Sequence, residues 1–172
     1  DYLTYIEYPE IEGLSDGENQ EAVNRQLKEL FIAEYQKAQT EEEEFYASVS
    51  VNYSVQMNKN LLAIRKSGYY YALGAAHGQP SIEYYHIDIR TGTFYKLKDL
   101  FKSGSKYKEK LTDIVNRQLQ LNSKVGEITG EMGYLVEKAQ VAEEQGFIIG
   151  KDSLRIYYDP YEIAPYAAGF PE

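Results

Sequence analysis

The sequence contains no cysteine, no tryptophan and only two histidines, His77 and His86. Without cysteine the chain has no disulfides, no thiolate nucleophile and no Cys-based zinc site. The P-loop, G-x-G-x-x-G, H-E-x-x-H and nucleophile-elbow patterns are also absent, so no enzyme class is indicated by a motif. We therefore expect a protein that is not an enzyme and that needs no cofactor.

Long hydrophobic runs and excess positive charge are lacking as well. No stretch approaches the roughly 18 apolar residues of a membrane-spanning helix. The 18 basic residues are outnumbered by 27 acidic ones, giving a net charge of −9. Binding of nucleic acid or of an anionic membrane requires clusters of Lys and Arg, so neither is expected as a partner. A basic protein or a neutral glycan is compatible with this charge.

Tyrosine is the residue present in excess, with 18 Tyr against 6 Phe. Its apolar ring and polar tip suit hydrated recognition surfaces and half-buried strands equally well. The acidic run at residues 41–44 has two interpretations too, as an attraction for a basic partner or as a solvated loop. The chain starts at Asp1 without a signal-peptide pattern, and we interpret it as a processed segment whose anchor lies outside it.

Apolar residues at helical spacing follow an S-x-x-E capping box that begins at Ser15, which predicts a helix over 17–39. A second helix is predicted from about Ser105, and a short one over 132–139. The sequence Asn-Arg-Gln-Leu occurs in both long helices, at 24–27 and 116–119. This repetition favours two related subdomains.

Alternating apolar and polar residues from 45 to 57 predict a long strand with one buried face. Asn58-Lys59-Asn60 indicates a hairpin turn. Further strands are expected at 2–8, 61–71, 82–90 and 93–97, with a last hairpin of 147–149 and 154–158. The expected fold class is α+β, an antiparallel sheet with helices on one face, in one domain 1–172 with a possible subdivision into 1–75 and 76–172.

Candidate site residues are few. His77 and Gly78 lie in a loop rich in Gly and Ala, where the histidine either faces a ligand or caps a turn. A zinc site formed by His77, His86 and Asp88 is conceivable, but nothing in the sequence brings His77 to the other two, so no metal is expected. Glu162 is the acid with aromatic and apolar neighbours, either as a general acid of a hydrolase or as a turn cap.

The segment 157–171 is rich in Tyr, Pro and Ala. Asp159-Pro160 ends the preceding strand, and a helical turn is expected from Pro160 to Ile163, ended by Pro165. A rigid aromatic loop suits recognition because little conformational entropy is lost on binding. The expected binding residues are therefore Tyr161, Glu162, Pro165 and Tyr166, together with His77 and Gly78. The alternative is a well-packed crossover at the sheet edge.

Residues 158–169, Tyr-Asp-Pro-Tyr-Glu-Ile-Ala-Pro-Tyr-Ala-Ala-Gly, resemble the signature of a bacterial extracytoplasmic domain family. Stretches 8–14, 74–78, 88–92 and 97–101 agree with it in order, although Ala75 stands where the family usually has Gly. The family includes the sensor domains of anti-sigma-V factors, which are lysozyme receptors of Gram-positive bacteria. It also includes modules of cell-wall polysaccharide deacetylases and lipoproteins of unknown role.

This resemblance implies two related α/β subdomains and a binding role outside the cytoplasm, in a membrane-anchored or secreted protein. The partner it implies is a basic protein such as lysozyme. Alternatively, the chain is an accessory module that binds peptidoglycan or another glycan. Neither alternative involves catalysis, a cofactor or a metal in this segment.

Overall fold

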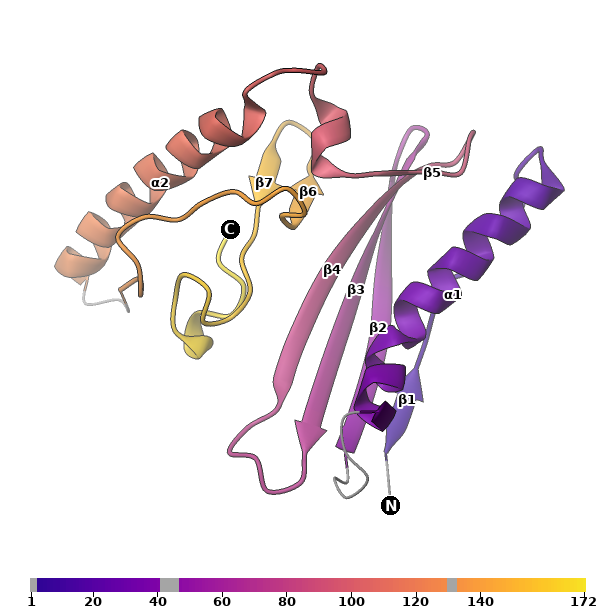
Figure 1. Ribbon diagram of the computed structural model, residues 1–172, viewed down its shortest axis with the longest axis horizontal. Helices are drawn as coiled ribbons and strands as arrows, with labels where there is room; N and C mark the ends of the chain where they lie inside the picture. The colour runs from indigo at the N-terminus through magenta and orange to yellow at the C-terminus, as the bar shows by residue number, and fades with distance from the viewer. Residues whose placement is uncertain (1–2, 41–46, 130–132) are drawn as a thin grey trace. The chain divides into compact units, whose positions relative to one another are not determined.

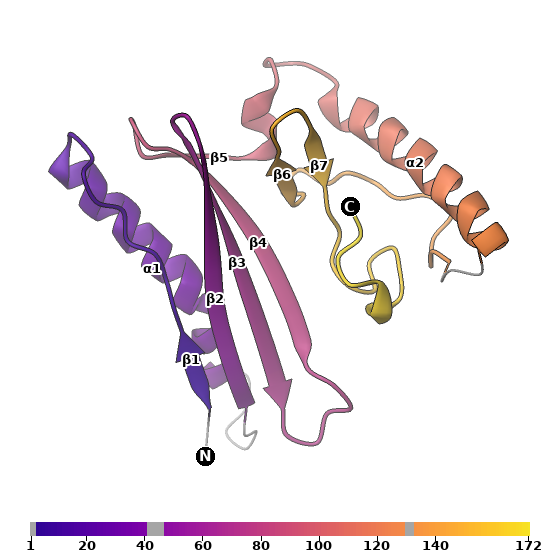
Figure 2. The ribbon, with the colours of Figure 1, turned by 180° about the vertical axis from the view of Figure 1, so that it is seen from behind.

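The computed structural model of the chain describes residues 3–40, 47–129 and 133–172, and its fold is α+β (Figures 1 and 2). Contacts divide the chain into two compact units, residues 1–94 (unit 1) and 95–172 (unit 2), each described by itself. The elements are β1 (Thr4–Ile6), α1 (Gly17–Thr40), β2 (Ala47–Asn58), β3 (Leu61–Ala72), β4 (Gln79–Asp88), β5 (Thr93–Tyr95), η1 (Leu97–Leu100), α2 (Tyr107–Thr129), β6 (Phe147–Ile149), β7 (Leu154–Ile156) and η2 (Tyr166–Ala168).

The sheet of unit 1 has the strand order β1-β2-β3-β4-β5. Strands β2, β3 and β4 form the expected antiparallel meander. Its first hairpin turns at Lys59, which has φ 54°. Strand β1 was expected, but it pairs parallel to β2, with Thr4 opposite Val49. Parallel neighbours need a crossover connection, and α1 supplies it between β1 and β2.

The core of unit 1 lies between α1 and one face of this sheet. Val23, Leu27 and Phe31 are spaced four residues apart, so they share one side of the helix. They pack against sheet residues that point to the same face: Val49, Val51, Leu62, Ile64 and Ile87. The helix predicted over 17–39 is therefore confirmed, and its apolar stripe covers the sheet.

A charged residue also lies in this core. The side chain of Lys66 is only 2% exposed. Its Nζ donates to the carbonyl oxygen of Leu30 in α1 at 2.9 Å and contacts Oε1 of Glu83 at 2.8 Å. Tyr85 donates its hydroxyl to the other oxygen of Glu83 at 2.5 Å. A buried ammonium is tolerable only with such partners, so Lys66 fixes where α1 lies on the sheet.

The apolar face of β2 is buried over only part of its length. Val49 and Val51 are buried, whereas Val55 is 57% and Met57 54% exposed. The expectation of a continuous buried face is therefore wrong for the second half of the strand. Strand β1 pairs with β2 only as far as Val51. Beyond that residue β2 is the outer strand of the sheet as far as the chain is described.

Unit 2 packs α2 against the β6–β7 hairpin, the residues after α2 and the C-terminal segment. Its buried cluster contains Leu97, Leu119, Ala139, Val141, Phe147, Ile156, Tyr158, Ile163 and Ala164. The second helix and the last hairpin are confirmed. The subdivision expected at 75–76 would separate β3 from β4, which are paired, and the contacts divide the chain at 94–95 instead.

The short helix expected over 132–139 is wrong for the described residues 133–139, which are irregular. Tyr134 and Val136 are half-buried while Leu135 is exposed, a period of two that suits an extended chain. The backbone of Ala139 bonds to a side chain of α2 rather than to its own neighbours. Packing of this segment on α2 therefore outweighs its local helical propensity.

One side-chain device holds an extended segment against the helix in each unit. In unit 1, Oδ1 of Asn24 accepts the N–H of Ile11 (2.8 Å) and its amide donates to the Ile11 carbonyl (3.0 Å). In unit 2, Asn116 accepts the N–H of Ala139 (2.8 Å) and donates to its carbonyl (3.0 Å). Both asparagines begin the repeated Asn-Arg-Gln-Leu sequence. The held segment precedes α1 but follows α2, so the shared feature is the clamp rather than the chain order.

Replacing Asn24 or Asn116 by Ala is expected to lower the free energy of unfolding by about 1–3 kcal/mol in each case, because a backbone N–H and a carbonyl lose their partners. Asn→Asp should cost nearly as much, since it retains the acceptor but not the donor. Urea denaturation measures the change, with Asn52→Ala on the exposed side of β2 as the control. If both Asn→Ala variants were as stable as the control, the clamps would have no structural role.

Candidate functional site

The C-terminal segment 157–171, here called the tail, is a closed loop that follows β7 and returns to Tyr158. Tyr158, Ile163 and Ala164 are buried in the core of unit 2. The N–H of Tyr158 donates to the carbonyl of Pro171 at 3.0 Å, which joins the two ends of the loop. Leu135 N–H donates to the Ile163 carbonyl at 2.8 Å. The tail is therefore fixed by buried contacts and backbone hydrogen bonds to other residues of unit 2.

The middle of the tail is a tight turn rather than the helical turn expected from Pro160 to Ile163. Glu162 N–H donates to the Asp159 carbonyl (3.0 Å), and Asp159 N–H donates to Oε2 of Glu162 (3.0 Å). Tyr161 has φ 71°, which a right-handed helix does not allow. The helical turn comes after Pro165, as η2, instead of before it.

This turn presents two aromatic rings. Tyr161 is 53% exposed. Its ring centroid lies 5.7 Å from that of Tyr166, with the planes tilted by 35°. A positive φ is unusual for a bulky residue and costs roughly 1–2 kcal/mol. The turn thus holds an exposed tyrosine in a conformation that its own backbone disfavours.

Glu162 is exposed, and its carboxylate caps the turn at Asp159. A general acid is typically set in apolar surroundings, so this environment fits the turn-cap interpretation. The pKa of Tyr158 is raised to about 12, mainly because its hydroxyl is buried and secondly because the negative charge of Glu162 lies nearby. Tyr158 therefore stays protonated and donates to the carbonyl of Gln140 at 3.2 Å.

His77 and Gly78 lie in unit 1, between β3 and β4, so they belong to a different unit from the tail. His77 is exposed, and its Nδ1 lies 3.0 Å from the Gly78 carbonyl oxygen. Gly78 is buried under Tyr69: a Cβ there would lie 2.2 Å from Cζ of that ring. Gly78 is thus a packing position. In the same loop, the residue with a left-handed backbone is Gly74, at φ 87°. Ala75, which stands where the resembled family usually has Gly, donates its N–H to the carbonyl of Ala72.

Two of the residues considered as zinc ligands, His86 and Asp88, lie in environments of other kinds. His86 is fully buried, and burial lowers its pKa to about 4. Asp88 accepts from Nε of Arg90 at 3.0 Å and from Nη2 at 2.7 Å. Within the described ranges, no group of three or more His, Cys, Asp or Glu side chains is arranged to hold a metal ion.

Unit 2 also contains a pocket of about 420 Å³ between α2 and the tail. Sequence patterns did not indicate it, because its wall on α2 is made of residues that vary in type. The signal available was the presence of small and polar residues, Asn122, Ser123 and Gly126, close together on α2. Its lining residues are Asn122, Ser123, Val125, Gly126, Gly133, Tyr134, Ala164, Ala168, Pro171 and Glu172.

Residues 98–172, which include α2, the pocket and the tail, match a family model described as a protein of unknown function, DUF3298. This part of the chain is similar to the DUF3298 family. Over 154 residues the chain is 25% identical to the peptidoglycan-N-acetylmuramic acid deacetylase PdaC of Bacillus subtilis. That match covers 86% of this chain but 32% of the enzyme, so the chain spans about a third of it.

Two crystal structures of DUF3298 proteins have a similar fold. One from Bacteroides fragilis is 30% identical, with a TM-score of 0.59, over 89% of this chain and 60% of the other. One from Pseudomonas aeruginosa is 20% identical, with a TM-score of 0.58, over 82% and 63%. The second likeness concerns the fold alone. Neither helix in the described residues combines the length and hydropathy needed to cross a bilayer.

The buried His86 predicts a pH dependence of stability. Its pKa falls from 6.5 to about 4 on folding, so between these values the unfolded chain binds a proton that the folded chain refuses. The free energy of unfolding should therefore be highest above pH 6.5 and decrease toward pH 4, by up to about 3 kcal/mol from this group.

His86→Gln should flatten this slope in urea denaturation across that range, whereas His77→Gln, at the exposed histidine, should retain it. NMR titration gives the assignment directly, because the chain has only two histidines. A His86 resonance that titrates near pH 6.5 would contradict the prediction.

Proposed function

We propose that this chain is a non-catalytic binding domain that acts outside the cytoplasm and recognises a basic protein such as lysozyme. The observation that carries the proposal is the tyrosine pair Tyr161–Tyr166, in which Tyr161 is exposed and Tyr166 half-buried, together with the exposed acidic side chains of Asp159 and Glu162. The family resemblance of the tail supports the same class of function. In this role binding shifts the position or dynamics of the domain, and an adjoining segment carries the signal.

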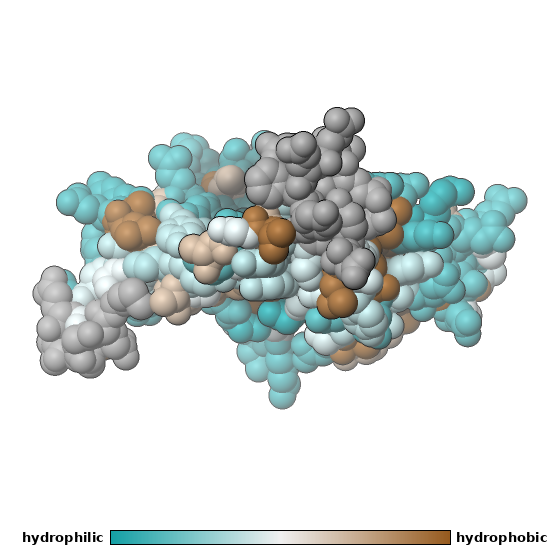
Figure 3. Space-filling model, turned by 90° about the horizontal axis from the view of Figure 1, so that it is seen from below, coloured by the Kyte–Doolittle hydropathy of each residue, from teal (hydrophilic) through white to brown (hydrophobic). Residues whose placement is uncertain are grey.

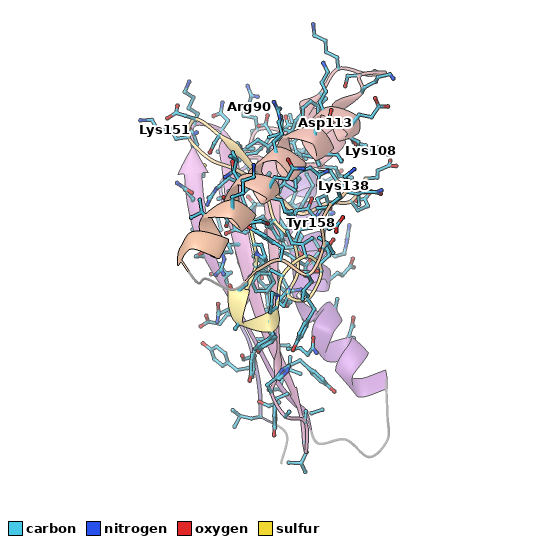
Figure 4. All side chains as sticks on the ribbon, turned by 90° about the vertical axis from the view of Figure 1, so that its left-hand side faces the viewer. Arg90, Lys108, Asp113, Lys138, Lys151 and Tyr158 are labelled. Atoms are coloured by element: carbon cyan, nitrogen blue, oxygen red, sulfur yellow. The ribbon has the colours of Figure 1, made fainter. Side chains whose placement is uncertain are left out.

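The charge around this turn favours a cationic partner. Residues 156–172 contain Asp159, Glu162 and Glu172 but no Lys or Arg. In Figure 4 the labelled lysines Lys108, Lys138 and Lys151 project at the end of unit 2 remote from the η2 turn. A Lys or Arg can lie over a tyrosine ring and donate to a neighbouring carboxylate at once. The net charge of −9 also speeds encounter with a basic protein.

The backbone of Tyr161 supports a role beyond packing. At φ 71° a glycine would be favoured over tyrosine if conformation alone decided the residue. Backbone strain of this kind occurs at binding and catalytic sites, where the displayed side chain is needed. The side chains drawn in colour in Figure 3 are mainly hydrophilic, with separate hydrophobic spots.

A second candidate function is that of an accessory module that binds cell-wall glycan. The likeness to part of a peptidoglycan deacetylase favours it. Such a module holds an enzyme at its polymeric substrate and itself performs no chemistry. Tyrosine rings can stack on sugar rings, and carboxylates can accept from sugar hydroxyls, so the tail residues are compatible with this ligand as well.

Lysozyme is the partner to test directly. Titration of the protein with lysozyme at low salt should give a dissociation constant of about 10 µM or tighter, and moderate salt should weaken it because opposite charges are screened. An acidic protein of similar size should not bind. Absence of lysozyme binding at low salt would contradict the receptor function. Retention of the protein on insoluble peptidoglycan would then favour the accessory module.

Variants of the tail test which residues contact the partner. Tyr161→Gly and Tyr166→Ala should each weaken partner binding by about tenfold or more, about 1.4 kcal/mol. Tyr161→Gly should leave the melting temperature unchanged or raise it, since glycine relieves the positive φ. Tyr5→Ala is the matched control, because Tyr5 is 54% exposed and bonded to Glu7.

Binding and melting temperature must be read together for these variants. Loss of the fold in Tyr161→Gly would show that the ring is part of the core. Unchanged binding in both tail variants would place the recognition surface elsewhere.

A further inference from the structure

We propose that the pocket between α2 and the tail binds a neutral N-acetylated sugar. The proposal rests on the second candidate function, glycan binding, and gives that function a site and a ligand class. The pocket has a volume of about 420 Å³ and is formed wholly by residues of unit 2. This volume falls in the range of about 300–1,000 Å³ that is typical of small-molecule sites.

The walls of the pocket are fixed by contacts already present. Asn122 on α2 donates its amide to the hydroxyl of Tyr134 at 3.0 Å and accepts from Gln118 at 2.9 Å. On the tail side, Ala164 belongs to the buried core. Ala168 lies in η2, and its backbone N–H donates to the Pro165 carbonyl at 2.8 Å. A site held in this way loses little entropy when a ligand binds.

The charge of the lining excludes anionic ligands. Among the lining residues that the structure describes, none is Lys, Arg or His. Glu172 is the one charged residue in this described part of the lining, and its carboxylate is bonded to Arg155. A phosphate or carboxylate ligand would enter without a cation to receive it, at a cost of desolvation. The lining therefore favours an uncharged ligand.

The lining also combines the two kinds of surface that an acetamido sugar presents. The Asn122 amide and the hydroxyls of Ser123 and Tyr134 can exchange hydrogen bonds with sugar hydroxyls and with the acetamido N–H and carbonyl. Val125 and Ala168 offer apolar surface to the acetyl methyl group. The glycines at 126 and 133 add no side chain to the walls, so a sugar ring can approach the backbone.

The pocket and the tyrosine pair can be separated by mutation, because Tyr161, Glu162 and Tyr166 do not line the pocket. Ala168 and Ala167 are neighbours in η2 and both are exposed. Only Ala168 lines the pocket. Ala168→Phe therefore fills it, while Ala167→Phe adds the same ring to the same short helix outside it.

The test uses the protein at its natural length and the β-1,4-linked tetramer of N-acetylglucosamine as the probe, measured by calorimetry. The wild type and Ala167→Phe should bind it equally, and Ala168→Phe should bind about tenfold or more weakly with an unchanged melting temperature. Cellotetraose, which lacks the acetamido groups, should bind more weakly than the probe.

Three outcomes would overturn the proposal in distinguishable ways. If Ala168→Phe bound the probe as well as the wild type, the pocket would not be the site, although glycan binding would stand. If cellotetraose bound equally well, the acetamido group would not be recognised. If the wild type bound neither the probe nor peptidoglycan, the accessory-module function would fail together with its site.

Discussion

The tail depends on one constraint, the burial of Ile163 and Ala164 in the core of unit 2. Two buried residues in the middle of the loop pull its backbone inward, and the bond from Tyr158 to Pro171 closes its base. The preceding turn must then reverse direction over very few residues, which places Tyr161 at φ 71° and outward. The wall of the pocket follows from the same burial, because Ala164 lines it as well. Packing inside unit 2 thus creates both candidate surfaces.

Each unit positions its helix by hydrophobic contact and then fixes it with a polar group. Apolar burial is nondirectional, so it leaves a helix free to slide along a sheet or a hairpin. Asn24 and Asn116 remove that freedom because each forms hydrogen bonds with the backbone of one residue, Ile11 and Ala139 respectively. Lys66 adds a hydrogen bond from the sheet to α1. These groups are costly when a partner is lost. They therefore specify one arrangement, although the net stability they contribute is modest.

The sequence predicted the elements whose burial has a clear period: α1, α2, most of the meander and the last hairpin. It failed where tertiary contacts oppose local preference. Residues 133–139 have good helix formers but are irregular, because they pack on α2 and Asn116 bonds the backbone of Ala139. The outer half of β2 alternates correctly yet stays exposed. The packing of Tyr69 on Gly78 is a tertiary contact that the sequence did not indicate. The pocket could not be predicted, since its walls come from segments about 40 residues apart in the sequence, Asn122 to Ala164.

The tail as a whole is neither only an interface nor only a packing element, because some of its residues are buried in the core and others are exposed. Tyr157, Tyr158, Ile163 and Ala164 are the buried apolar residues of the segment. Tyr161 and Glu162 point outward, and neither is needed to fill the core. A loop that served only to pack would gain from glycine at the left-handed position and would have no use for an exposed ring there. The presence of tyrosine at that position is therefore a stronger argument for recognition than the aromatic content of the segment.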